Sequence, residues 1–133
     1  MDLSSTLDVS ASALRAQSLR MRVIAENLAN QDSTAATPGG DPYRRRVVTF
    51  QPEMKDGAAH VRVRSVATDP SQFVRVHQPG HPGADAAGYV LRPNVNGLVE
   101  SADMRAAQRA YEANVGAVEA ARSMAQRTID LLK

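Results

Sequence analysis

Apolar residues recur every seven positions near both ends of the chain, and the repeat is absent between them. A seven-residue spacing keeps apolar side chains on one face of an α-helix, as in a coiled coil. We therefore expect a mainly α fold, in which long N- and C-terminal helices pair as a coiled coil around a small β-rich insert. The residues of this expected assembly seam are Leu7, Leu14, Met21, Ile24 and Leu28 near the N-terminus, and Met104, Tyr111, Val118, Ala125 and Leu132 near the C-terminus.

Three segments follow from this pattern: an N-terminal helical segment, 1–31; a loop with a small β-rich element, 32–100; and a C-terminal helical segment, 101–133. The first helix is predicted from Ser5 to Asn30, with Ser5 and Asp8 as a weak capping box. The second is predicted from Ser101 to Leu132, with Ser101 as its N-cap. Polar residues interrupt the second seam at Asn114 and Thr128, where a buried polar side chain sets register.

Short runs of alternating or β-branched residues in the middle segment predict four strands. They are Arg46–Phe50, bounded by Pro52; His60–Val66; Phe73–Val76; and Gly88–Leu91. Four strands of this length form at most a small β-element.

Composition narrows the class of protein. Only 4% of residues are aromatic, and many seam positions are alanine, so a compact core would be poor and the isolated monomer marginally stable. The net charge is +2, with 14 acidic residues interspersed among 16 basic ones, which argues against nucleic-acid binding. No apolar run is long enough to insert into a membrane, and the N-terminus lacks the apolar core of a cleavable signal peptide.

The sequence gives little support for a catalytic, metal or cofactor site. The chain has no cysteine, and Pro79 and Gly80 keep His77 and His81 off a common helical face, so we expect no metal site, no cofactor and no catalytic residues. The run Arg44–Arg46 is either a solvated edge or a set of partners for acidic neighbours. Asn27 and Asn30 suit the C-terminal cap of the first helix.

Several motifs resemble the family of flagellar rod and hook proteins, and most closely its short proximal rod subunits. The first is Ala25–Asn30 with the preceding run 13–24, and the others lie at 42–45, 85–96 and 101–115. The resemblance extends over both ends of the chain and the anchors of the middle segment, about two-thirds of its length. The motif residues that we single out are Asn27, Leu28, Ala29, Asn30, Pro42, Tyr43, Arg44, Arg45, Pro93, Asn94, Asn96, Ala110, Tyr111, Glu112, Ala113 and Asn114.

The resemblance implies a structural subunit of the flagellar basal-body proximal rod, which transmits torque and encloses the export channel. It implies terminal helices that pack into a helical tube, and export through the flagellar type III apparatus to the periplasmic rod without a cleaved signal. The implied partners are copies of the chain itself, other proximal and distal rod proteins, and proteins at the junction of the rod and the MS ring. The alternative is a soluble helical adaptor or export chaperone that binds partner helices without polymerising.

Overall fold

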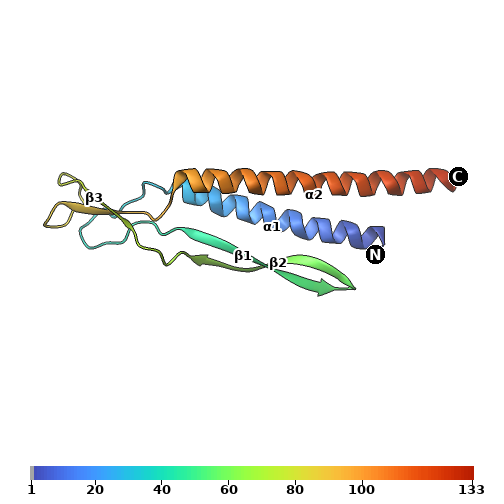
Figure 1. Ribbon diagram of the computed structural model, residues 1–133, viewed down its shortest axis with the longest axis horizontal. Helices are drawn as coiled ribbons and strands as arrows, with labels where there is room; N and C mark the ends of the chain where they lie inside the picture. The colour runs from blue at the N-terminus through green and yellow to red at the C-terminus, as the bar shows by residue number, and fades with distance from the viewer. Residues whose placement is uncertain (1) are drawn as a thin grey trace. The chain divides into compact units, whose positions relative to one another are not determined.

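Two long helices enclose four strands along the chain, in the order α1–β1–β2–β3–β4–α2 (Figure 1). The computed structural model describes residues 2–133. Helix α1 spans Leu3–Ala29 and helix α2 spans Gly97–Leu131. The expected fold class, mainly α with a small β-rich insert between terminal helices, is confirmed. No helix within residues 2–133 combines the length and the apolarity that a membrane crossing needs.

Helix α1 begins at Leu3, two residues before the predicted start at Ser5. The carboxylate of Asp2 accepts a hydrogen bond from the Ser5 backbone N–H at 2.7 Å, which satisfies one of the free donors of the first turn. The predicted capping box of Ser5 and Asp8 is therefore wrong. At the other end, the Asn30 side-chain amide donates to the carbonyl oxygen of Glu26 at 2.9 Å, so the expectation that Asn30 caps this helix is confirmed.

Helix α2 begins at Gly97, four residues before the predicted Ser101. The side-chain oxygen of Asn96 accepts hydrogen bonds from the backbone N–H groups of Leu98 at 3.0 Å and Val99 at 3.4 Å. Asn96 is thus the N-cap, and Ser101 is an exposed residue within the helix. The prediction of Ser101 as N-cap is wrong because asparagine at a helix start offers the same acceptor one turn earlier.

Strands β1, Arg46–Lys55, and β2, Ala58–Thr68, form the first two-stranded sheet. Asp56 and Gly57 connect them with φ angles of 53° and 77°, the two positive values that a type I′ hairpin turn requires. Pro52 lies inside β1, although the sequence pattern predicted that it bounds the strand. Each strand of a two-stranded sheet has one edge without a partner strand. At that edge the missing N–H of proline costs no hydrogen bond between strands.

Strands β3, Val74–His77, and β4, Tyr89–Arg92, form a second, antiparallel sheet. Both predicted strands are confirmed with their bounds shifted by one residue. The predicted single β-element is instead two separate hairpins. Gly88 precedes β4 with a φ of 84°, a left-handed conformation that other residues rarely adopt.

The chain forms two compact units, and both helices contribute to each. Unit 1 contains Met1–Met21, Val48–Ser65 and Arg105–Lys133, and unit 2 contains Arg22–Val47 and Val66–Met104. The buried apolar side chains of unit 1 are Ala16, Ala58, Ala107 and Ala121, and those of unit 2 are Val23, Ile24 and Val90. Small side chains therefore dominate the apolar core. The sequence predicted segment boundaries after residues 31 and 100. As a division into domains, these boundaries stay a prediction.

Candidate functional site

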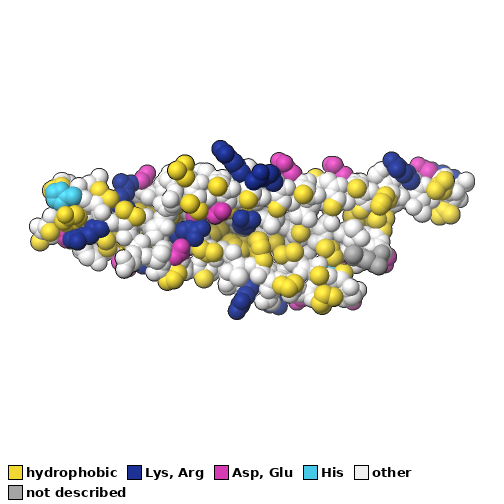
Figure 2. Space-filling model, viewed as in Figure 1, with side chains coloured by type: hydrophobic (Ala, Val, Ile, Leu, Met, Phe, Trp, Pro, Cys, Tyr) yellow, Lys and Arg dark blue, Asp and Glu magenta, His cyan; other side chains and the backbone are white. Residues whose placement is uncertain are grey.

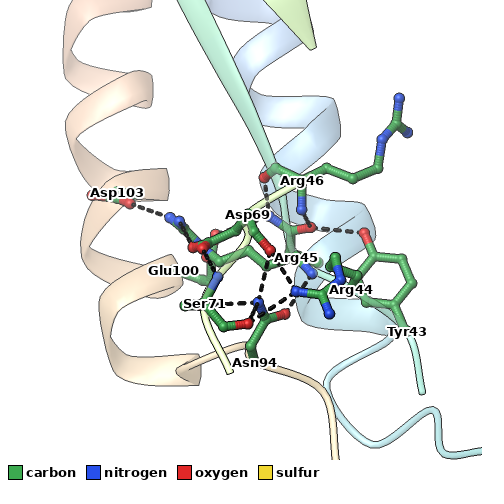
Figure 3. Close-up of polar contacts among 10 residues, drawn as sticks. Tyr43, Arg44, Arg45, Arg46, Asp69, Ser71, Asn94, Glu100 and Asp103 are labelled. Atoms are coloured by element: carbon green, nitrogen blue, oxygen red, sulfur yellow. Dashed lines mark hydrogen bonds and ion pairs between the residues drawn. The ribbon is translucent and has the colours of Figure 1, made fainter. Parts of the chain in front are cut away.

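A network of polar side chains fills the centre of unit 2 (Figure 3). We call this network the polar clamp. Its members come from five separate places in the sequence, and two of them, Asn27 and Glu100, are among the largest fully buried side chains. Buried polar groups are costly unless they are hydrogen-bonded, so each partner matters. The members are Asn27, Tyr43, Arg44, Arg45, Asp69, Asn94 and Glu100.

Asn27, near the end of α1, pairs with the backbone of Arg46 as a peptide group would. Its Oδ1 accepts from the Arg46 N–H at 3.0 Å, and its Nδ2 donates to the Arg46 carbonyl at 2.9 Å. The same Oδ1 accepts from the Tyr43 hydroxyl at 2.7 Å, and Nδ2 also reaches Glu100 Oε2 at 3.4 Å. The expectation that Asn27 is a helix cap is wrong, because its amide holds the start of β1 against α1.

Glu100 and Arg45 form the charged centre of the clamp. The Glu100 side chain is 1% exposed, and its Oε1 accepts a hydrogen bond from Nε of Arg45. Arg45 also reaches Asp69 Oδ2 at 3.2 Å and Asp103 Oδ2 at 3.7 Å. Removing one partner of a buried ion pair leaves the other charge uncompensated, so these two residues depend on each other.

Asn94 and Arg44 connect the clamp to the stretch 69–71. Asn94 Oδ1 accepts from the Arg45 backbone N–H at 2.7 Å, while its Nδ2 donates to the Ser71 hydroxyl at 3.0 Å. Arg44 Nη1 donates to the carbonyl oxygens of Asp69 at 2.8 Å and Ser71 at 2.9 Å. These bonds satisfy backbone carbonyls of a segment that lies outside any strand.

The run Arg44–Arg46 makes its contacts within the chain. Arg44 bonds to backbone carbonyls, Arg45 pairs with Glu100, and Arg46 Nη1 pairs with Glu26 Oε2 at 2.8 Å. The expectation of a solvated edge is therefore wrong, and pairing of this run with acidic residues of neighbouring rod subunits stays a prediction. The sequence carried no signal for these pairs, because their acidic members lie up to 55 positions away.

The electrostatics of the clamp follow from these contacts. The hydrogen bond to Glu100 raises the pKa of the Arg45 guanidinium. Hydrogen bonds from the Ser71 backbone and side chain lower the pKa of Asp69, and Arg45 adds to this effect. Burial raises the pKa of the Tyr43 hydroxyl, and the negative charge of Glu26 acts in the same direction. At neutral pH the clamp therefore holds a charged arginine, a charged Asp69 and a neutral tyrosine.

The remaining motif residues have local roles. Pro42 and Pro93 are buried, and each directly precedes a clamp residue in the sequence. On α1, Leu28 is half-buried and Ala29 is exposed. Asn30 and Asn96 cap the two helices, as described above. The motif 110–114 lies on α2, where Ala110, Tyr111 and Asn114 are half-buried and Glu112 and Ala113 are exposed.

The two polar interruptions of the α2 seam bond within their own helix. The Asn114 amide donates to the Ala110 carbonyl at 2.8 Å, and the Thr128 hydroxyl donates to the Met124 carbonyl at 3.0 Å. Thr128 is exposed, so the expectation that both are buried in the seam is wrong for this residue.

The seam of α2 coincides with the side of the helix that is most buried within the chain. Glu100, Ala107 and Ala121 are buried, and Met104, Tyr111, Val118 and Ala125 lie half-buried on the same stripe, at spacings of three and four residues. Leu132 follows the end of the helix and is 83% exposed.

The seam of α1 lies differently. The buried residues of this helix are Ser10, Ser12, Ala16, Val23, Ile24 and Asn27, of which Ser12, Ala16, Val23 and Asn27 form one stripe. The residues of the expected seam lie on another side of the helix from this stripe. Four of them are half-buried, namely Leu7, Leu14, Met21 and Leu28, and Ile24 is buried. An apolar stripe of α1 is therefore only partly covered by its own chain.

The histidines make contacts inside the chain. His81 Nδ1 accepts from the Gly83 N–H at 2.9 Å, and its Nε2 lies 3.0 Å from the Thr34 hydroxyl. The His77 ring packs edge-on against Tyr89, with ring centroids 4.9 Å apart. Among residues 2–133, no three His, Asp or Glu side chains gather as metal ligands would.

Two family models match the two ends of the chain. Residues 7–36 match the family model described as flagella basal body rod protein, and residues 86–131 match the model described as flagellar basal body rod FlgEFG protein C-terminal. The first match covers most of α1 and the second covers β4 and α2. Both ends of the chain thus carry the sequence of flagellar rod proteins.

Curated relatives match over nearly the whole chain. A flagellar basal-body rod protein FlgC of Agrobacterium fabrum is 46% identical, over 98% of this chain and 96% of the relative. The FlgC proteins of Escherichia coli O6:H1, 42% identical over 98% of each chain, and of Bacillus subtilis, 39% identical over 96% of this chain and 97% of the relative, are similar. The chain therefore belongs to the FlgC family of flagellar basal-body rod proteins, which are structural and non-enzymatic.

Proposed function

We propose that this rod subunit joins its neighbours through the partly covered seam of α1 and the exposed end of α2, and that the resulting layer of helices forms the wall of a tube. The contacts would transmit torque along the rod and leave a central channel for export. The partners are copies of the chain, other proximal and distal rod proteins, and proteins at the junction of the rod and the MS ring.

The observation that carries this proposal is the partly covered stripe of α1. Leu7, Leu14, Met21 and Leu28 keep apolar surface in contact with water, while the buried stripe of the same helix is used inside the chain. Apolar surface of this kind on a helix is stabilised by packing against another helix. Neighbouring rod subunits supply such helices in a polymer.

A second observation is the exposed end of α2. Helix α2 continues past the start of α1 within unit 1 (Figure 1), and every residue from 126 to 133 is exposed. Hydrophobic side chains lie at the surface of this end (Figure 2), including Ile129 at 51% and Leu131 at 86% exposure.

Passage through the flagellar type III apparatus is part of the proposal. A core lined with alanine buries little area, so the free energy that holds the monomer folded is small. A subunit of this kind unfolds readily for transport and regains stability from its neighbours in the rod. The adaptor or chaperone hypothesis loses its basis, because the relatives that match over nearly the full length are rod proteins.

The decisive experiment is a clean deletion of the gene in the source bacterium, with isolated basal bodies examined by electron microscopy. We expect ring structures without rod, hook or filament, restored by the intact gene. Complete flagella in the deletion strain would contradict the proposal.

Complementation with seam variants tests the contacts themselves. Leu14→Asp places a carboxylate on the stripe of α1 that a neighbour would cover, and Val118→Asp places one on the half-buried side of α2. Each should abolish rod assembly and swimming. The matched controls Ser18→Asp and Ala120→Asp introduce the same group at exposed positions of the same helices and should swim. Equal swimming by all four variants would remove the seam assignment while leaving the rod role intact.

A further inference from the structure

A loop of unit 2, residues 34–40, lies over strand β4, and we call this loop the strap. Residues of both segments line a cavity of about 150 Å³, namely Ala35, Gly39 and Gly40 of the strap and Tyr89, Val90 and Leu91 of β4. Val90 is 2% exposed, whereas Leu91 is 40% exposed. Movement of the strap away from the hairpin would therefore uncover more of an apolar strand.

The strap has a fixed base and one further polar link. At the base, the Tyr43 backbone N–H donates to the Ser33 carbonyl at 2.9 Å, and the carboxylate of Asp32 pairs with Arg92. Beyond the base, the Thr34 hydroxyl lies 3.0 Å from Nε2 of His81. Among residues 2–133, His81 is the one side chain of the hairpin that bonds to the strap.

His81 also holds the turn of the hairpin on which it lies. Its Nδ1 accepts a hydrogen bond from the Gly83 backbone N–H at 2.9 Å. A backbone N–H can only donate, so Nδ1 carries no proton and the single proton of the neutral ring lies on Nε2, facing Thr34. The closed strap thus requires the neutral form of His81, in one tautomer.

The turn that His81 holds is in direct contact with the strap. A Cβ atom at Gly83 would collide with the carbonyl oxygen of Ala35, so the two backbones touch at this point. A change in the turn at residues 81–83 therefore moves a group that packs against the strap.

The surroundings of His81 offer no partner for a second ring proton. The other side chains on the neighbouring segments that can carry charge are Asp32, Asp41, Arg75, His77, Asp85 and Arg92. Asp32 pairs with Arg92, and Asp85 pairs with Arg75 at 3.8 Å. Among residues 2–133, only Thr34 and Gly83 bond to the His81 ring.

We propose that His81 is a pH-sensitive switch, and that protonation of its Nδ1 releases the strap from β4. A protonated Nδ1 and the Gly83 N–H are both donors, so their hydrogen bond is lost and the turn has to rearrange. The open form holds one proton more than the closed form. The ratio of open to closed molecules should therefore rise by up to about tenfold for each unit of falling pH. This inference goes beyond the rod function and does not depend on contacts between subunits.

Hydrogen exchange of single amides tests the switch on the full chain, followed by NMR from about pH 7.5 to about pH 5. The protection factor corrects each rate for the intrinsic effect of pH. For the Gly83 amide it should fall by up to about tenfold per pH unit, over the range in which histidine gains its charge. The Tyr43 amide, which bonds to the base of the strap, should keep its protection. Constant protection at Gly83, or an equal loss at both amides, would overturn the inference.

Two variants assign the response to one histidine. His81→Asn offers a carbonyl oxygen in place of Nδ1 but has no ring to protonate, so the Gly83 protection factor should no longer depend on pH, whatever its absolute value. His77→Asn removes the other histidine of the hairpin and should keep the full dependence. An acid response that survives in His81→Asn, or that disappears in His77→Asn, would contradict the assignment. The rod role is tested separately by the deletion strain.

Discussion

Unit 2 is organised around large buried polar side chains, whereas the buried residues of unit 1 are small, namely alanines and two serines. In unit 2, Asn27 and Glu100 are almost inaccessible to solvent and fully hydrogen-bonded. In unit 1, Ala16, Ala107 and Ala121 occupy the equivalent depth. Hydrogen-bonded polar cores specify one arrangement, because any other leaves buried groups unpaired. Alanine permits close approach of helices but gains little from burial, so unit 1 depends more on whatever packs against it.

The largest expected effect comes from breaking the charged centre of unit 2. Glu100→Ala leaves Arg45 without its buried partner and should cost about 3–5 kcal/mol of the free energy of unfolding. Urea unfolding of the full chain, followed by circular dichroism, measures the loss. The control Asp103→Ala removes a carboxylate that is 39% exposed and 3.7 Å from the same arginine, and it should change stability by less than about 1 kcal/mol. Equal losses in the two variants would refute the central role of Glu100.

A smaller effect is expected in unit 1, from overpacking rather than from lost polar bonds. Ala121→Leu adds volume at a position that is 3% exposed and should cost about 1–3 kcal/mol. Ala120→Leu makes the same change at the exposed neighbouring position and should alter stability by at most about 0.5 kcal/mol. The same unfolding assay compares them. If Ala121→Leu stabilises the chain, unit 1 contains unfilled space around this position. The two units would then differ in how densely their interiors are packed.

The hydroxyl of Tyr43 tests how far single neutral bonds matter within the clamp. Tyr43→Phe removes only the donor to Asn27 Oδ1, which keeps its bond from the Arg46 N–H, so the expected cost is about 0.5–1.5 kcal/mol. Thermal unfolding of the variant against the parent chain gives the value. A cost as large as that of Glu100→Ala would mean that the clamp fails as a unit when any bond is lost.

The smallest effect is a dependence of stability on pH. Asp69 has a pKa that is lower in the folded chain than in the unfolded one, so its contribution is present above the unfolded pKa of about 3.9 and is lost as pH falls through the folded value. Stability should therefore decline below about pH 5. Asp69→Asn should flatten this decline in unfolding curves recorded from pH 7 to pH 3. An unchanged slope would assign the acid sensitivity to other carboxylates.

Much of this architecture could be predicted from the sequence. The seven-residue repeats located both helices to within a few residues, and short β-branched runs located the four strands. Local chemistry decides such features, since periodicity and turn residues act over a few positions. The errors at Ser101 and Pro52 arose where a neighbouring residue, Asn96, or a free strand edge offered another solution.

The clamp could not be predicted in the same way. The motifs drew attention to Asn27, Tyr43, Arg45 and Asn94, yet nothing in their spacing showed that they meet. Glu100 carried no signal at all, although it is the most deeply buried charged residue. A buried ion pair depends on contacts between residues far apart in sequence, and those follow only from the tertiary fold.

The way the two units divide the chain bears on the export through the flagellar type III apparatus that we propose. Unit 1 needs residues up to 21 together with residues beyond 104, and unit 2 needs residues near 22 together with residues near 104. The bond between Asn27 and Glu100 alone closes a separation of 73 positions. Contacts this distant in sequence form only after the intervening chain is free to close the loop. A chain halfway through a narrow conduit therefore contains neither unit complete, whichever end enters first, and it emerges able to fold only once nearly all of it has passed.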